Sequence, residues 1–309
     1  MEVTLLGTGD TTGTPTVGCD CDTCERARET GVERSRFSVH VRSEATGESL
    51  LVDASPDFRH QFLTRDVPLP DAALITHVHF DHLDGLGNAY RLFDDLPVYA
   101  ADVVDPVTGE SVADTIRSKY DYLERVTVHD VTPFETVEVC GLELTLVPVD
   151  HPPMLCYGLA VADPETGGTL SITGDTSYAI PDESREVLAD ADLLLADAIL
   201  PAHMCSYHPL GGTHHDDAGV PRTFGTKHMT REGALDLADE LDAERVRLVH
   251  LAHFYPVEEA FEAGVERTGY GKDLGPMLFD IIEKFADYAF NKSHTFGYGL
   301  VTYQTAYLK

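Results

Sequence analysis

The segment ITHVHFDHLDGLG at residues 75–87 limits the fold of this chain more than any other. An apolar run ends at Thr76, and a helical pattern starts after residue 82. Four metal-ligating side chains stand between them: His77, His79, Asp81 and His82. Side chains at such a strand-to-helix turn can point at one spot, and imidazole together with carboxylate suits Zn, Mn or Fe. We therefore expect a site for two metal ions at the end of a buried strand.

Three further candidate ligands stand where other strand-like runs end. They are His151, Asp175 and His250, in chain order. A single histidine or aspartate at a strand end is often only a cap or a satisfied polar residue, so each is weak evidence alone. Together with residues 77–82 they form the ordered set HxHxDH, H, D and H, which gives two ions enough ligands.

This ordered set resembles that of the metallo-β-lactamase superfamily of binuclear metallohydrolases, and the N-terminal segment LLGTGDTTGTP also fits that pattern. The resemblance implies an α/β fold, a four-layer αββα sandwich with the metals at one edge between two β-sheets. It also implies the ligand sets. One ion would be held by His77, His79 and His151, the other by Asp81, His82 and His250, with Asp175 bridging both.

Short apolar or β-branched runs alternate with turns along the chain, as in α/β proteins. The strand-like runs lie at 2–6, 37–41, 49–54, 72–76, 97–101, 136–149, 155–162, 169–173, 192–198 and 245–251. Helical periodicity lies at 56–65, 82–93, 105–118, 182–190, 230–241 and 277–289. No low-complexity linker divides the chain. We expect a single hydrolase domain over 1–309, with an insertion at about 201–227 and a C-terminal extension after about 255.

Half of the six cysteines lie in one short loop, GCDCDTCERAR, as Cys19, Cys21 and Cys24. A disulfide or chance clustering is the alternative, but three thiols leave one unpaired and a reducing cytosol disfavours disulfides. A structural zinc site needs a fourth ligand. His253 is a good candidate, three residues after His250 in VHLAHF. The remaining cysteines, Cys140, Cys156 and Cys205, read as free thiols.

The combination of CDCxxC, HxHxDH and a terminal HxxH resembles one subfamily, the phosphoribosyl cyclic phosphate phosphodiesterases of the carbon–phosphorus lyase pathway. The phrases GCDCDTCERAR, LITHVHFDHLDGL and VRLVHLAHF carry this likeness over roughly residues 1–255. It implies conversion of 5-phosphoribosyl 1,2-cyclic phosphate to ribose 1,5-bisphosphate, with two active-site ions (Zn or Mn) and one structural Zn. It also implies that His228 is an active-site histidine and not a ligand. We expect Asp81 and His228 to be the catalytic side chains.

The charge balance bears on partners and environment. The chain has 22 Lys+Arg against 53 Asp+Glu, a formal net charge of −31 spread along the sequence. This pattern favours a surface hydrated in concentrated salt over an ordinary acidic protein. We expect a cytoplasmic protein that binds a small phosphate ester as its substrate and has neither a nucleic acid nor a membrane as partner. The sequence is also compatible with a homodimer. Arg222 and Lys227 are candidates for binding a second substrate phosphate.

Other activities of the same superfamily remain alternatives. The endonuclease that trims tRNA 3′ ends shares the metal motif, but it docks tRNA through a basic arm that we do not find here, and the acidic charge opposes phosphate contacts. Thioester or lactone hydrolysis can use the same metals, and a pyrroloquinoline quinone biosynthetic protein also carries a CxCxxC loop. A non-enzymatic scaffold conflicts with the complete ligand set. The insertion contains four histidines, His203, His208, His214 and His215. Two interpretations of them remain open: they line the active site, or they are ordinary residues of a polar loop.

Overall fold

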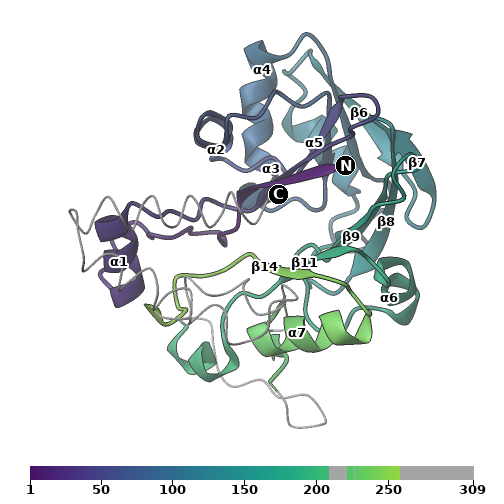
Figure 1. Cartoon of the computed structure of the whole chain (residues 1–309). Coiled ribbons are helices and arrows are strands. Elements are labelled where there is room, and N and C mark those ends of the chain that lie inside the picture. The colour runs from purple at the N-terminus through teal and green to yellow at the C-terminus, as the bar shows by residue number, and fades with distance from the viewer. Residues whose placement is uncertain (209–220, 226, 258–309) are drawn as a thin grey trace.

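Two six-stranded β-sheets face each other in the computed structural model, which describes residues 1–208, 221–225 and 227–257 (Figure 1). The first sheet has the order β1 (Glu2–Gly7), β2 (Ser38–Arg42), β3 (Ser49–Val52), β4 (Ala72–Ile75), β5 (Leu96–Ala101) and β6 (Val126–Val131). The second has the order β14 (Val246–Val249), β11 (Leu193–Asp197), β10 (Thr169–Ile172), β9 (Cys156–Ala162), β8 (Leu142–Val149) and β7 (Thr136–Val139). A short ladder joins β12 (Thr223–Phe224) to β13 (His228–Met229).

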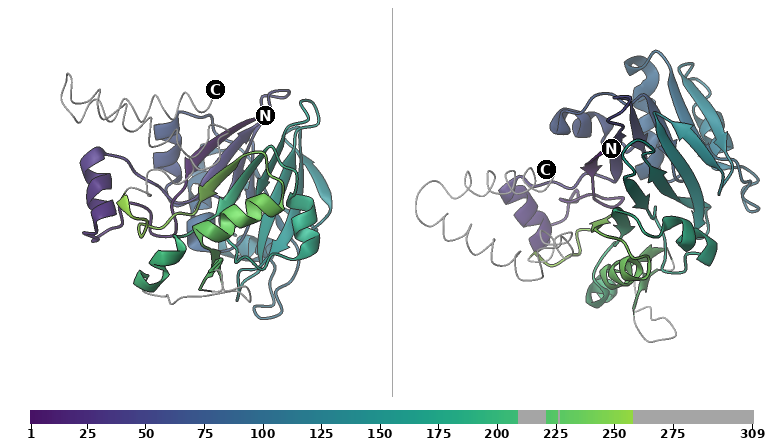
Figure 2. Two further views of the ribbon diagram at one scale, coloured as in Figure 1. Left: turned by 60° about the horizontal axis from the view of Figure 1, so that its bottom comes forward. Right: turned by 45° about the vertical axis from the view of Figure 1, so that its right-hand side comes forward.

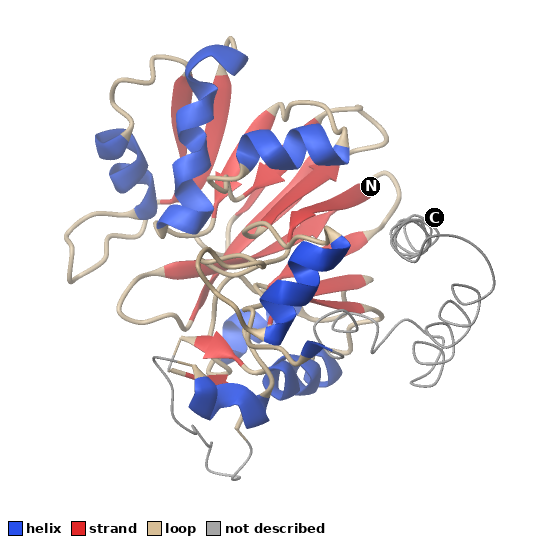
Figure 3. Cartoon of the chain, turned by 90° about the vertical axis from the view of Figure 1, so that its left-hand side faces the viewer, coloured by secondary structure: helices blue, strands red, loops and turns tan. Residues whose placement is uncertain are grey.

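Helices cover the outer faces of both sheets, which gives the expected αββα order of layers (Figures 1 and 3). On the first sheet lie α2 (Phe58–Arg65), α3 (Phe80–Leu83), η1 (Asp84–Asn88), α4 (Ala89–Leu92) and α5 (Val112–Lys119). On the second lie α6 (Asp182–Leu188) and α7 (Arg231–Glu240), and η2 (Ala202–Tyr207) follows β11. Helix α1 (Asp22–Thr30) stands apart from both helical layers (Figure 2).

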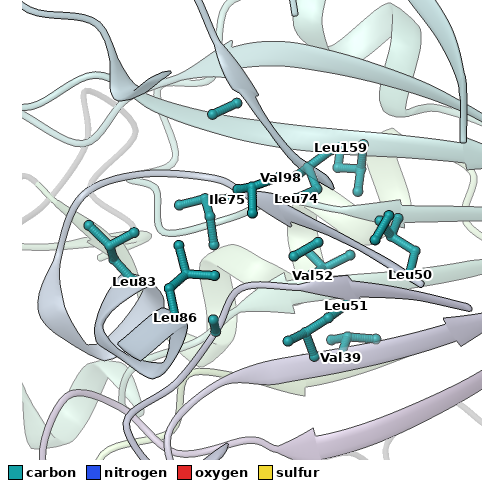
Figure 4. Packing of buried hydrophobic residues seen from close by; sticks show 14 of the residues in the cluster. Val39, Leu50, Leu51, Val52, Leu74, Ile75, Leu83, Leu86, Val98 and Leu159 are labelled. Atoms are coloured by element: carbon teal, nitrogen blue, oxygen red, sulfur yellow. The ribbon is translucent and has the colours of Figure 1, made fainter. Parts of the chain in front are cut away.

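The main core fills the space between the sheets. Val39, Leu51 and Leu74 of the first sheet belong to the same buried cluster as Leu144 and Leu159 of the second. Figure 4 shows several of these side chains together with those of the turn after β4. Strands β2, β3 and β4 are buried along nearly their whole length, because the second sheet covers one face of the first sheet and helices cover the other. Within the described residues, no helix combines the length and the apolar character needed to cross a bilayer.

Several predicted elements differ from the observed ones for local reasons. The predicted helix 105–118 begins only at Val112, because Gly109 has a positive φ of 77° and Ser111 forms a capping box with Asp114. The predicted strand 136–149 is a hairpin, since Cys140 and Gly141 both take positive φ values and turn the chain between β7 and β8. Strand β6 and helix α1 were not predicted. The predicted helix at 277–289 lies outside the described residues.

The predicted helix 82–93 is broken into three short pieces, α3, η1 and α4. Gly85 donates its backbone N–H to the Ala54 carbonyl at 2.7 Å instead of continuing the helical ladder. A Cβ at Gly85 would lie 2.2 Å from the Ser55 carbonyl oxygen, so only glycine permits this approach. The contact holds the turn that carries the metal motif against the end of β3.

His40 on β2 predicts a pH dependence of folding stability. Its side chain is buried, and burial lowers the pKa of its imidazole below 6.5, although the carboxylates of Glu2 and Asp71 act in the opposite direction. The folded state therefore takes up fewer protons than the unfolded state. Stability from this group is complete above pH 6.5 and is lost as the pH falls below it.

We expect the free energy of unfolding to fall toward pH 5 by at most about 1.4 kcal/mol per pH unit from this group. The measurement is urea unfolding of the metal-loaded chain and of His40→Leu between pH 5 and 7.5. His40→Leu should have the shallower pH slope. Equal slopes for the two proteins would contradict this assignment.

Candidate metal centre

The predicted ligands meet where strands of both sheets end. His77 follows β4, His151 follows β8, Asp175 follows β10, and His250 follows β14. Strands β3, β4 and β5 run parallel in one sheet, and β10, β11 and β14 run parallel in the other. Carboxyl ends of parallel strands share one edge of a sheet, where ligands of open α/β sheets commonly bind. The structure thus brings all seven predicted ligands to one edge of the sandwich.

One group of ligand atoms comprises His77, His79, His151 and Asp175, whose ligand atoms all lie within 4.8 Å of one another. Nε2 of His77 is 2.9 Å from Nδ1 of His79, and Nε2 of His151 is 3.3 Å from the same atom. Nε2 of His77 lies 3.7 Å from Oδ2 of Asp175. Zn–N bonds of about 2.0–2.1 Å in a tetrahedron place ligand atoms about 3.3 Å apart. The spacing of this group fits one ion.

The second group comprises Asp81, His82 and His250. Oδ2 of Asp81 lies 3.4 Å from Nε2 of His82 and 3.5 Å from Nε2 of His250. Oδ2 of Asp175 lies 3.3 Å from Nε2 of His82 and 3.2 Å from Nε2 of His250. One oxygen of Asp175 therefore borders both groups, which is the placement that a bridging ligand requires.

Buried partners fix the outer nitrogen of three of these imidazoles. His82 Nδ1 donates to Asp53 Oδ2 at 2.7 Å, and His151 Nδ1 donates to the Lys227 carbonyl at 2.8 Å. His77 Nδ1 lies 3.0 Å from Oγ1 of Thr76, which itself hydrogen-bonds to Asp53. Each ring thus turns Nε2 inward, and the buried Nε2 of His82 has no hydrogen-bond partner among the described residues. Metal-ligating histidines are oriented in this way, so the donor set fits divalent ions.

Electrostatics at the centre favour bound cations. Burial alone would raise the pKa of Asp81, but the hydrogen bond from His250 and the nearby imidazole of His82 hold it well below its usual range. Burial opposes charge on His250 as well, yet Asp175 and Asp81 raise its pKa to about 9. The pKa of His79 is lowered to about 4 by burial and by the nearby His151. Carboxylates that attract protons here would attract a divalent ion in their place, with release of protons.

His228 lies beside the second group. Its Nδ1 donates to Oδ2 of Asp197 at 2.8 Å, and its ring stacks on that of His250 with centroids 5.0 Å apart. A ring nitrogen of His228 is also within 4.8 Å of ligand atoms of Asp175 and His250. Asp197 is fully buried at the end of β11 and also accepts from the backbone N–H of Thr176.

The three cysteines of the N-terminal loop meet His253. Sγ of Cys19 and Sγ of Cys21 each lie 3.4 Å from Nδ1 of His253, and Cys24 completes a group within 4.8 Å. Burial and the neighbouring Cys21 raise the pKa of Cys24 to about 12. A coordinating cation reverses this, because a thiol bound to zinc is deprotonated. None of the six cysteines forms a disulfide. The geometry fits a tetrahedral Cys3His site at the start of α1.

Residues 48–251 match the family model described as "Beta-lactamase superfamily domain". The chain belongs to the β-lactamase superfamily. Together with the two facing sheets, this identifies a metallo-β-lactamase-fold, metal-binding hydrolase. The superfamily assignment agrees with the position of the ligands at the strand ends.

Solved structures of the superfamily resemble this chain over most of its length. A new diphosphatase from the PhnP family is 29% identical, with a TM-score of 0.65 over 84% of this chain and 90% of that one. Zn²⁺-bound PqqB from Methylobacterium extorquens shares the fold at 23% identity and a TM-score of 0.67, covering 86% and 95% of the two chains. The short form of human tRNase Z shares it at 20% identity, with a TM-score of 0.57 over 82% of this chain and 93% of that one.

Two curated relatives match parts of longer proteins. An octanoyltransferase from Porphyromonas gingivalis is 30% identical over 84% of this chain, and the chain spans 47% of its length. DNA polymerase III subunit alpha of Pseudomonas aeruginosa is 55% identical over 49 residues, which are 16% of this chain and 4% of that protein. The activities in these two names are those of the longer proteins, of which this chain matches only a part.

Sequence reasoning missed two buried carboxylates, Asp53 and Asp197. Each stands at the end of a strand-like run, the same signal that picked out His151 and Asp175.

Arg222, a predicted phosphate-binding candidate, already has partners in the structure. Its Nε donates to Asp236 at 2.6 Å, and its guanidinium lies over the ring of Tyr178. In the insertion, His208 packs against Phe224 and Phe254, whereas His214 and His215 lie outside the described residues.

Proposed function

We propose that this chain is a metal-dependent phosphodiesterase that opens a small cyclic phosphate diester, with 5-phosphoribosyl 1,2-cyclic phosphate as substrate and ribose 1,5-bisphosphate as product. The observation that carries the proposal is the joint presence of the seven-ligand centre and the Cys19–Cys21–Cys24–His253 cluster in one chain. The likeness to a diphosphatase of the PhnP family supports it, at 29% identity over 90% of that chain. The activity in the name of that neighbour is hydrolysis at phosphorus, the chemistry proposed here.

The proposal assigns the two ion positions to residues already described. His77, His79 and His151 would hold one ion and Asp81, His82 and His250 the other, with Asp175 between them. Divalent ions there, Zn or Mn, would activate water and neutralise charge on the phosphoryl oxygens. Zinc at the Cys3His cluster would be structural, tying the N-terminal loop to the strand end that carries His250.

His228 would supply the proton that the departing sugar oxygen needs. Its Nδ1 hydrogen bond to Asp197 fixes the ring and leaves Nε2 as the nitrogen that exchanges a proton. The carboxylate of Asp197 would hold the imidazole of His228 in one tautomer and one orientation, as the aspartate of a catalytic triad does. The side chain of His228 is 14% exposed and that of Asp197 is 1% exposed. The imidazole ring is therefore accessible from solvent, whereas its carboxylate partner is not.

Replacing His228 with Asn tests this role. We expect turnover to fall about 10²- to 10⁴-fold, the usual contribution of general acid–base catalysis, while the metal content stays at the wild-type level. Asp197→Asn should cause a smaller loss, because the imidazole remains. The measurements are steady-state hydrolysis and metal analysis of each purified variant. Loss of an ion from His228→Asn would instead make His228 a ligand.

A substrate panel tests the activity itself. The purified full chain, loaded with Mn²⁺ or Zn²⁺, is assayed against bis(p-nitrophenyl) phosphate, 2′,3′-cyclic nucleotides, a thioester, a lactone and a tRNA precursor. We expect hydrolysis of the phosphate diesters, fastest for the small cyclic ones. Hydrolysis restricted to the thioester, the lactone or the tRNA precursor would overturn the proposal and select the corresponding alternative.

A further inference from the structure

The loop after β1 reaches the metal centre through one hydroxyl. Oγ1 of Thr11 donates to Oδ2 of Asp81 at 2.7 Å, across 70 residues of sequence. The same oxygen faces Nε2 of His82 at 3.4 Å and Nε2 of His250 at 3.5 Å. Thr11 is therefore bonded to the oxygen of Asp81 that faces its proposed co-ligands. None of the seven ligands predicted from the sequence for the two active-site ions lies in this loop.

Arg36 holds Thr11 in place from the neighbouring segment. Its Nε donates to the Thr11 carbonyl at 2.8 Å, and its Nη1 and backbone N–H donate to Asp57 at 2.8 and 2.9 Å. Its guanidinium also lies 5.7 Å from the ring centroid of Phe80, the residue before Asp81. Arg36 thus contacts the segments on both sides of the bond between Thr11 and Asp81.

The loop is anchored to the strand end that carries His250. The backbone N–H of Leu251 donates to the Thr8 carbonyl at 2.9 Å, and that of Asp10 donates to the Leu251 carbonyl at 3.2 Å. The Asp10 carboxylate accepts from the backbone of Thr12 and Gly13 at 3.1 and 3.0 Å. These bonds limit the positions open to Thr11, so its hydroxyl is held ready for Asp81.

We propose that Thr11 is a positioning residue for Asp81. A carboxylate can turn about its Cβ–Cγ bond and present either oxygen, and the hydroxyl bond selects the orientation in which Oδ2 points toward His82 and His250. A hydrogen bond to a ligating carboxylate also uses one lone pair and leaves another directed at the ion. Partners of this kind change metal affinity by about 10- to 100-fold. Thr11 is exposed to solvent, so we expect the lower end of that range. The proposal rests on the metal-binding assignment and not on the substrate.

The test uses Co²⁺ titration of the full chain after its active-site ions have been removed with a chelator. Thr11→Val keeps the shape and removes the hydroxyl, and Thr11→Ser keeps the hydroxyl. We expect Thr11→Val to weaken one Co²⁺ site about tenfold and to change its visible absorption spectrum. Thr11→Ser should restore both. Thr12→Val is the matched control, because the Thr12 hydroxyl bonds to Asp10 and to Thr16 in the same loop.

Wild-type Co²⁺ affinity and spectrum in Thr11→Val would overturn the proposal, and so would an equal loss in Thr12→Val or Thr11→Ser. Arg36→Lys provides an independent variant if Thr11→Val does not fold, since lysine has no Nε donor for the Thr11 carbonyl. On its own, Arg36→Lys should weaken the same Co²⁺ site, and wild-type affinity would contradict the proposal. Where Thr11→Val folds, the loss of affinity in Arg36→Lys should be smaller than that of Thr11→Val and should not add to it in the double variant. Additive losses would contradict the proposal. Wild-type Co²⁺ binding without hydrolysis of phosphate esters would count against the proposed function instead.

Discussion

Asp175→Asn is expected to remove both active-site ions and to reduce turnover to background. Oδ2 of Asp175 borders both ligand groups, at 3.7 Å from His77 Nε2 and 3.2 Å from His250 Nε2. The substitution keeps the shape of the side chain but removes its charge from a position that is 3% exposed. Loss of an outer partner costs metal affinity about 10- to 100-fold, and loss of a shared ligand should cost more. The amide also cannot balance the charge of two cations.

Metal analysis and steady-state hydrolysis of the same preparation measure both effects. Asp192→Asn is the matched control, because Asp192 also accepts a hydrogen bond at β10, from the backbone of Thr169, but at the other end of that strand. It should retain both ions and wild-type turnover. Retention of both ions by Asp175→Asn would show that this carboxylate is not shared between them.

Cys21→Ser is expected to cause a large loss of folding stability together with loss of the structural zinc. Cys21 precedes α1 and its Sγ lies 3.4 Å from Nδ1 of His253, so the cluster joins residues 232 positions apart. Zinc binding to small Cys/His peptides is worth about 10–16 kcal/mol, and that energy contributes directly to folding. Even a fraction of it would lower the melting temperature by many degrees.

Turnover by the folded fraction of Cys21→Ser should change much less than its stability, because no cysteine belongs to the seven-ligand centre. The measurements are zinc content, thermal unfolding and hydrolysis. Cys140→Ser serves as the control, since its thiol donates to the Ser49 carbonyl and lies outside the cluster. A Cys21→Ser chain with full zinc content and an unchanged melting temperature would refute the structural site.

Much of the architecture follows from local sequence signals. Most strand-like runs coincide with strands, and His77, His151, Asp175 and His250 were placed by the rule that ligands follow buried strands. The order of the layers came from resemblance to the superfamily, because periodicity within a strand does not specify which strands become neighbours. The family match and the two observed sheets confirm that fold.

The sequence did not show which residue supports which ligand. Asp53 supports His82, Asp197 supports His228 and Thr11 contacts Asp81, and each pair is at least 29 residues apart. The support of His151 comes from the backbone carbonyl of Lys227, which has no side-chain signature. Such contacts depend on how the two sheets and their loops pack, and a motif of ligands alone does not contain that information.

The most direct test of the central claim is ³¹P NMR of the metal-loaded full chain with 5-phosphoribosyl 1,2-cyclic phosphate. The account predicts that the cyclic diester signal disappears and a phosphomonoester signal of ribose 1,5-bisphosphate grows at the same rate, and that Asp175→Asn leaves the diester intact. Persistence of the diester signal with a fully metal-loaded protein would contradict it.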